Sequence, residues 1–114
     1  MPLLVLDDGT KLVQSLAVHD WVAMTYGFAP ETPMDRYKTT HMISLYMEDF
    51  LIRKYFKVFQ IKDPEEKKEA MANFLKNDVP WFLGHMERKL EGHKFFLGDK
   101  ITLLDFMLGG WLVN

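Results

Sequence analysis

A polar pair, Gln14-Ser15, offers the side chains best suited to ligand binding in the opening segment of this chain. The pair stands where a short aliphatic stretch is expected to end and a helix to begin. If the chain binds a small molecule, we expect the polar contacts to lie here. A purely structural interpretation is also open: the Ser15 hydroxyl caps the helix and Gln14 is a solvent-facing strand end.

A second polar constellation, Thr102 and Asp105, lies inside the apolar stretch ITLLDF. The two residues have the spacing of a helix capping box, and Ile101 and Phe106 stand at the two positions of a hydrophobic staple. A catalytic interpretation is the alternative, but no partner base lies nearby in the sequence. We therefore expect Thr102 and Asp105 to start a helix and not to carry chemistry.

Composition and charge argue against several other classes of function. The chain has no Cys, which removes thiol catalysis and Cys-ligated metal, and its net charge of -2 argues against nucleic acid as a partner. No apolar run approaches the roughly 18 residues of a membrane span, and no signal peptide follows Met1. We expect a cytoplasmic protein without a metal site. No two histidines are four residues apart, and they are interpreted as surface or capping residues: His19, His41, His85 and His93.

The opening segment reads as a small β-hairpin followed by a helix. Residues 3–6 and 10–13 are the expected strands, and Asp8-Gly9 between them predicts a two-residue type I′ turn. The helix is expected over 16–26, with Ser15 as its N-cap and Gly27 as its left-handed C-terminal residue. Such a unit is too small to be stable alone, so it must pack on the rest of the chain.

Three further helices are expected in the remainder. Thr32, Pro33 and Asp35 give a start signal for a helix that runs to about residue 59. The signal recurs at Asp63-Pro64, and that helix is expected to reach about residue 90 with a kink or break at Val79-Pro80. The last helix begins at the box of Thr102 and continues to the end of the sequence.

Three motifs in this order resemble the glutathione transferases, nearest to the sigma, pi and alpha group. DDGTKLVQSLAV is similar to the segment that closes their thioredoxin-like domain, Met1-Pro2 to the residue and cis-Pro before its third strand, and FFLGDKITLLDF to the central helix of their helical domain. The resemblance implies a mostly α fold. A partial thioredoxin-like domain, a hairpin plus helix over 1–28, would precede an incomplete all-helical domain over 32–114.

The resemblance also implies a ligand, glutathione, as substrate. Gln14 and Ser15 would bind its γ-glutamyl carboxylate, because an amide, a hydroxyl and a free helix N-terminus together suit an anion. The backbone at Met1 and Pro2 would contact the cysteinyl part. The alternative for Pro2 is a proline at a strand start.

The helix that follows Pro33 carries further implied roles. Tyr37, Tyr46 and Phe50 could line the electrophile pocket, with core or interface packing as the alternative. An acidic residue of this helix often reaches the partner subunit's glutathione in the family, and residues 39–45 offer none. Asp35 and Asp49 are the acids that could substitute.

The resemblance implies what else the parent protein would contain. Family members open with a strand–helix–strand unit whose Tyr or Ser hydroxyl stabilises the glutathione thiolate, and nothing here matches it. We therefore expect a middle segment of a glutathione transferase that conjugates glutathione to electrophiles. The alternative is a non-catalytic scaffold subunit. A homodimer partner or other protein subunits would cover the open strand edge at residues 4–6.

Overall fold

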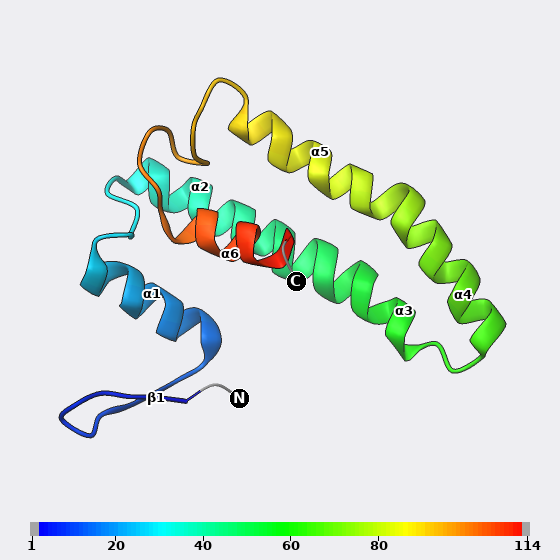
Figure 1. Ribbon diagram of the computed structural model, residues 1–114, viewed down its shortest axis with the longest axis horizontal. Coiled ribbons are helices and arrows are strands. Elements are labelled where there is room, and N and C mark those ends of the chain that lie inside the picture. The colour runs from blue at the N-terminus through cyan, green and yellow to red at the C-terminus, as the bar shows by residue number, and fades with distance from the viewer. Residues whose placement is uncertain (1–2, 113–114) are drawn as a thin grey trace.

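Helices make up most of the chain, and a single β-hairpin precedes them (Figure 1). The computed structural model describes residues 3–112, apart from the side chain of Trp111. In Figure 1 the hairpin and α1 (Ser15–Tyr26) lie on one side of α2 (Pro33–Ser44), and α5 (Val79–Leu90) lies on the other. This arrangement confirms the predicted fold class. No helix in the described part of the chain is long and apolar enough to cross a membrane.

The hairpin pairs β1 (Leu3–Val5) with β2 (Lys11–Val13) in antiparallel register, with Leu4 opposite Leu12. The predicted two-residue turn is wrong. The Leu6 N–H donates to the Thr10 carbonyl at 2.9 Å, so three residues, Asp7 to Gly9, form the loop. A type I′ turn needs positive φ at both central residues, and only Gly9 has it here, at 84°. The Asp8 carboxylate accepts from the Thr10 N–H at 2.8 Å and holds this loop.

The first helix, α1, ends as expected at Gly27. That glycine has φ 78°, and its N–H donates to the Ala23 carbonyl. The Phe28 N–H donates to the same carbonyl at 2.8 Å. At the other end the prediction is wrong, because Gln14 and not Ser15 occupies the N-cap position.

Two long helical rods form the body of the fold. The first joins α2, the π-helical segment η1 (Leu45–Tyr55) and α3 (Phe56–Gln60) without interruption. The second joins α4 (Pro64–Asn73), η2 (Phe74–Asp78) and α5. Their predicted caps are confirmed: the Thr32 hydroxyl accepts from the Asp35 N–H at 3.1 Å, and the Asp63 carboxylate accepts from the Glu66 N–H at 2.9 Å.

The second rod is not interrupted at Pro80, where we predicted a kink or a break. The irregularity lies in the five residues of η2 just before α5, where the helix widens to a π-helical pattern. Proline has no N–H to donate, so the carbonyl one turn earlier loses its α-helical partner. A local π turn shifts the hydrogen-bond register and lets the helix continue.

The core lies between the two rods and is largely aromatic. The Phe50 and Phe82 rings stack with centroids 4.3 Å apart, and Phe74 packs on Phe50 at 5.4 Å. The last helix, α6 (Leu103–Leu112), adds Leu104 and Leu108, each 1% exposed. Phe50 and Phe74 belong to η1 and η2, so the two π-helical segments meet at this core.

A network around the Asp105 carboxylate begins α6. It accepts from the Thr102 N–H at 2.8 Å, from the Thr102 hydroxyl at 3.0 Å and from the Phe96 N–H at 2.9 Å. This confirms the expected capping role, although the Thr102 hydroxyl donates here and does not receive the Asp105 N–H. The Leu103 N–H donates to the Phe28 carbonyl at 2.9 Å, which ties α6 to the end of the opening unit.

We expect Asp105→Ala to lower the free energy of unfolding by about 2–4 kcal/mol, because it leaves two partly buried N–H groups without an acceptor. The matched control is Asp35→Ala, which removes the carboxylate of an exposed box of the same type and should cost about 0.5–1 kcal/mol. Urea denaturation of both variants measures the difference. Equal losses would contradict a special role for Asp105.

Candidate functional site

The junction between β2 and α1 is built around an unusual backbone conformation at Gln14. This residue has φ 72° and ψ 111°, the only positive φ outside glycine among the described residues. A positive φ is costly for a residue with a Cβ and persists only where the surroundings enforce it. The Gln14 carbonyl accepts from the Val18 N–H at 2.9 Å, so the strained residue begins the helix.

The amino-terminal end of α1 is left open beside Gln14. The first N–H groups of a helix have no acceptor within the helix, and no side chain caps them here. The first turn carries no acidic residue either, so the positive end of the helix dipole is not neutralised locally. The side chains of Gln14 and Ser15 are both exposed beside it. This arrangement of an amide, a hydroxyl and free N–H groups can bind a carboxylate.

Two further residues are predicted to contact glutathione through their backbone. Met1 and Pro2 lie outside the described residues. Their predicted backbone contact with the cysteinyl part of the ligand therefore stays a prediction.

The three aromatic residues expected to line a pocket do not lie together. Tyr46 and Phe50 both pack against Phe82, at 5.9 and 4.3 Å between ring centroids, and Phe50 has no exposed surface. Burial raises the pKa of the half-buried Tyr46 hydroxyl. Only Tyr37 is exposed, and it lines a separate cavity, where its ring stacks on His41 with centroids 6.0 Å apart. For Phe50 the burial favours the packing interpretation.

Asp35 and Asp49, the two acids that could contact the partner subunit's glutathione, both interact with nearby side chains of their own chain. The Asp35 carboxylate accepts from the Thr32 hydroxyl at 2.7 Å, and the Asp49 carboxylate pairs with Arg53 at 3.2 Å. Thr102 and Asp105 form the network described above. Among the described residues, no group of three His, Asp or Glu side chains could hold a metal ion.

One feature was missed from the sequence: a cavity of about 310 Å³ lined by α2, the end of α5 and the loop after it. Basic and imidazole side chains gather there from Lys38 and His41 on α2, Arg88 and Lys89 on α5, and His93. The cavity residues of α2 and those of α5 are about fifty residues apart in the chain. In the sequence, only the spacing of Lys38 and His41 on one helix face could have indicated part of this basic group.

His85 lies near this basic group. Its ring meets Trp81 edge-on at 4.9 Å, and Lys54 lies 4.9 Å over the same Trp81 ring. Burial lowers the pKa of His85, and the nearby charges of Arg88, His41 and Lys89 lower it further. The folded chain therefore favours the neutral imidazole at this position.

Comparisons with known proteins agree with the fold. A family model described as "Glutathione S-transferase, C-terminal domain" matches residues 48–112, more than half of the chain. The chain belongs to the glutathione S-transferase family. Among its relatives, S-crystallin SL11 of Nototodarus sloanii is 32% identical over 118 residues, covering 100% of this chain and 56% of the relative. Hematopoietic prostaglandin D synthase of Gallus gallus is 27% identical over 99 residues, covering 87% of this chain and 48% of the relative.

A solved structure of a glutathione S-transferase is also similar to this chain. The glutathione S-transferase from Ascaris lumbricoides superposes with a TM-score of 0.70 and 27% identity, covering 99% of this chain and 56% of that one. The glutathione S-transferase chain therefore spans about half the length of the curated relatives and solved structures that it matches.

The lowered pKa of His85 predicts a pH dependence of stability. The unfolded chain takes up a proton near the ordinary pKa of 6.5, whereas the folded chain resists it. As the pH falls through that value the unfolded state binds more protons, so the free energy of unfolding decreases. We expect His85→Gln to reduce this decrease, measured by urea denaturation between about pH 7.5 and 5.5. His19→Gln, at an exposed position on α1, controls for loss of an imidazole. An unchanged slope in His85→Gln would contradict the prediction.

Proposed function

We propose that this chain is the part of a glutathione transferase that binds the γ-glutamyl end of glutathione, and that its parent protein conjugates the thiol to electrophiles. The observation that carries the proposal is the junction of β2 and α1. There an uncapped helix N-terminus, without a neighbouring acid, stands beside the exposed side chains of Gln14 and Ser15.

The chemistry of this junction suits a carboxylate. Free N–H groups and the positive end of the helix dipole attract an anion, and hydrogen bonds to an ionised group are stronger than neutral ones. The Gln14 amide and the Ser15 hydroxyl add donors. The strained backbone of Gln14 supports the same proposal, because costly backbone conformations cluster at ligand-binding sites.

The conjugation step needs a group that this chain does not supply. A hydroxyl that donates to the glutathione sulfur would favour the thiolate and so activate the nucleophile. In the family this hydroxyl belongs to a strand–helix–strand unit, and no segment of the present sequence matches it. The proposed role of this chain is therefore to bind and orient glutathione, while residues of the parent protein outside this chain activate the thiol.

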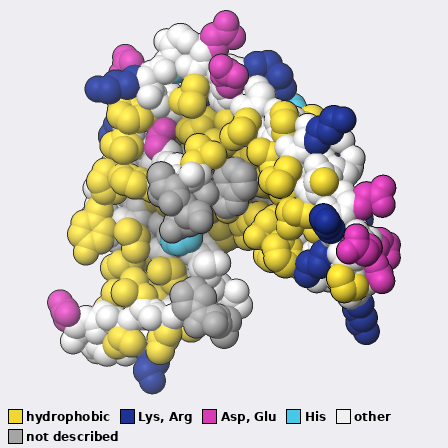
Figure 2. Space-filling model, turned by 45° about the vertical axis from the view of Figure 1, so that its right-hand side comes forward, with side chains coloured by type: hydrophobic (Ala, Val, Ile, Leu, Met, Phe, Trp, Pro, Cys, Tyr) yellow, Lys and Arg dark blue, Asp and Glu magenta, His cyan; other side chains and the backbone are white. Residues whose placement is uncertain are grey.

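A second candidate is a non-catalytic scaffold subunit, and the open surface of the molecule favours it. Leu3 and Val5 of the hairpin are 56% and 53% exposed, and Figure 2 shows apolar side chains spread over much of one face. The radius of gyration is 16.6 Å, against about 13 Å for a compact domain of this length. The relatives include S-crystallins, a prostaglandin D synthase and a glutathione S-transferase.

Binding of glutathione tests the first proposal. We expect Gln14→Ala and Ser15→Ala each to weaken binding by about tenfold, because each removes one hydrogen bond to a charged group. Isothermal titration calorimetry measures the dissociation constant. Gln60→Ala, at the exposed end of α3, is the matched control and should bind as the wild type does. Unchanged binding in both site variants would overturn the assignment.

Association tests whether another subunit covers the hairpin. We expect the wild-type chain to self-associate and Leu3→Lys to shift it toward the monomer, because a lysine on a strand edge opposes pairing with another chain. Sedimentation velocity over a range of concentrations measures this. Leu75→Lys replaces a leucine of similar exposure, 58%, on the distant η2 segment and should leave association unchanged. Equal effects of the two substitutions would contradict a role for the hairpin.

A further inference from the structure

A cavity between α2 and the carboxyl-terminal end of α5 combines an apolar floor with a basic rim. Its volume is about 310 Å³, close to the lower limit of small-molecule sites in proteins. Met42 and Leu104 form part of the floor and are 2% and 1% exposed. Phe96 and Leu97, from the loop between α5 and α6, add partly buried apolar surface.

The side chains at the rim carry more positive charge than the neighbouring carboxylates neutralise. Lys38, Arg88 and Lys89 line the cavity with two imidazoles, and Glu91 is the one carboxylate among the lining residues. None of these three cations makes an ion pair within the described part of the chain. The ion pairs found there join other residues: Arg53 with Asp49, Lys54 with Asp78, and Lys100 with Glu31. The chain as a whole has a net charge of -2, so this basic group is local.

Helix geometry accounts for only part of this group. Arg88 and Lys89 lie in the last turn of α5, where basic residues interact favourably with the negative end of the helix dipole. Lys38 lies inside α2, far from that helix end in sequence, and its presence on the rim has no such explanation. The positive field also acts on a neighbour: burial lowers the pKa of His85, and the charges of Arg88, His41 and Lys89 lower it further.

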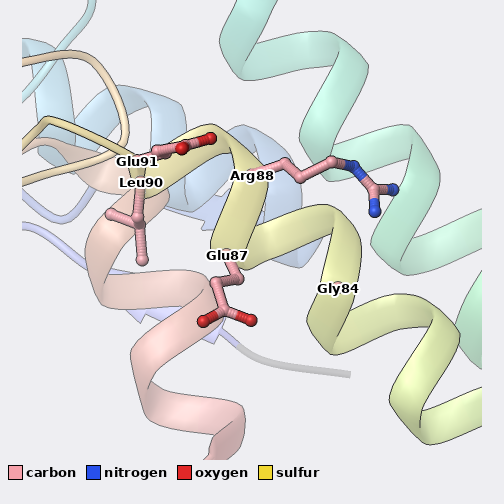
Figure 3. Close-up of a pocket in the computed structure, with 5 residues that line it drawn as sticks. All are labelled: Gly84, Glu87, Arg88, Leu90 and Glu91. Carbon is pink, nitrogen blue, oxygen red and sulfur yellow. The ribbon is translucent and has the colours of Figure 1, made fainter.

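Arg88 is one of the residues that line the cavity. Figure 3 shows a neighbouring pocket that Arg88 also lines, and there the Arg88 and Glu87 side chains extend from α5 in different directions. A Cβ at Gly84 would lie 3.6 Å from Arg88 Nη1, so the guanidinium folds back over a position that carries no side chain. Among the described residues, no ion pair occupies its donors.

We propose that this cavity binds a small phosphate monoester whose compact apolar or aromatic body rests on the floor. A dianionic phosphate matches several cations better than a single charge does, and arginine suits phosphate because its planar group can donate two parallel hydrogen bonds. The exposed ring of Tyr37, stacked on His41 at the rim, offers an aromatic face to the body of the ligand. The inference is independent of the proposed glutathione site, which uses the start of α1.

Titration of the full chain with phenyl phosphate, followed by backbone amide NMR, tests the proposal. We expect saturable shifts in residues of α2 and the end of α5, weaker binding of inorganic phosphate, which lacks the apolar body, and weaker binding of benzyl alcohol, which lacks the charge. Rising salt should weaken the binding of phenyl phosphate because charges at the surface are screened. Absence of saturable shifts in these segments would overturn the proposal.

Charge-removing variants sharpen the test. We expect Arg88→Gln and Lys38→Gln each to weaken binding of phenyl phosphate by about threefold to tenfold. Arg53→Gln, an exposed arginine on η1 outside the cavity, is the matched control and should bind as the wild type does. Equal weakening by Arg53→Gln, or none by the first two, would overturn the proposal. Gln14→Ala should leave phenyl phosphate binding unchanged, and Arg88→Gln should leave glutathione binding unchanged. These two measurements test the two proposed sites independently.

Discussion

The hydrogen bonds of the Asp105 carboxylate hold the amino-terminal end of α6, and the position of the opening unit depends on that end. One oxygen of the carboxylate accepts from Thr102 and the other accepts from the Phe96 N–H. Beside them the Leu103 N–H donates to the Phe28 carbonyl, and Phe106 meets the Phe28 ring edge-on at 5.2 Å. Phe28 immediately follows α1 and its terminal Gly27, so this joint fixes the opening unit against the helical body.

The joint matters because the main core contains no residue of the hairpin or α1. The core consists of side chains of the two rods and α6, with Phe50, Phe74 and Phe82 at its centre. The two π-helical segments lie where these aromatic residues meet, so the irregular hydrogen bonding of the rods and their packing coincide. The hairpin and the start of α1 stay at the surface, where Gln14 and Ser15 remain accessible. The helical body of this glutathione S-transferase chain thus serves as a support for an exposed junction.

Features set by a few neighbouring residues could be predicted from the sequence. The starts of the helices at Thr32, Asp63 and Thr102 follow from side chains that accept or donate within one turn, and the end at Gly27 follows from the freedom of glycine at positive φ. The long extent of the first rod follows from the absence of Gly and Pro between residues 34 and 60, whereas Pro80 in the second rod predicted a kink or break. The resemblance to the family rested on three motifs in the correct order: Met1-Pro2, DDGTKLVQSLAV and FFLGDKITLLDF.

Features that depend on several elements could not be predicted. The sequence shows no reason for the positive φ of Gln14, because the residue is forced into it by the junction of strand and helix. The Asp8 carboxylate accepts a hydrogen bond from the Thr10 N–H, which favours a three-residue loop over the expected two-residue turn. The basic cavity joins residues of α2 to residues of α5, and only the antiparallel packing of the rods brings Lys38 and Arg88 to the same rim.

The central claim is that the open amino-terminal end of α1 is a carboxylate site for glutathione. Backbone amide NMR during titration with glutathione tests it most directly, because the N–H groups of Ser15, Leu16 and Ala17 are the donors concerned. The account predicts saturable shifts of these amides that S-methylglutathione reproduces, since it keeps the γ-glutamyl carboxylate, and that a glutathione amidated at this carboxylate does not. Unshifted amides at the start of α1, or equal shifts with the amidated form, would contradict it.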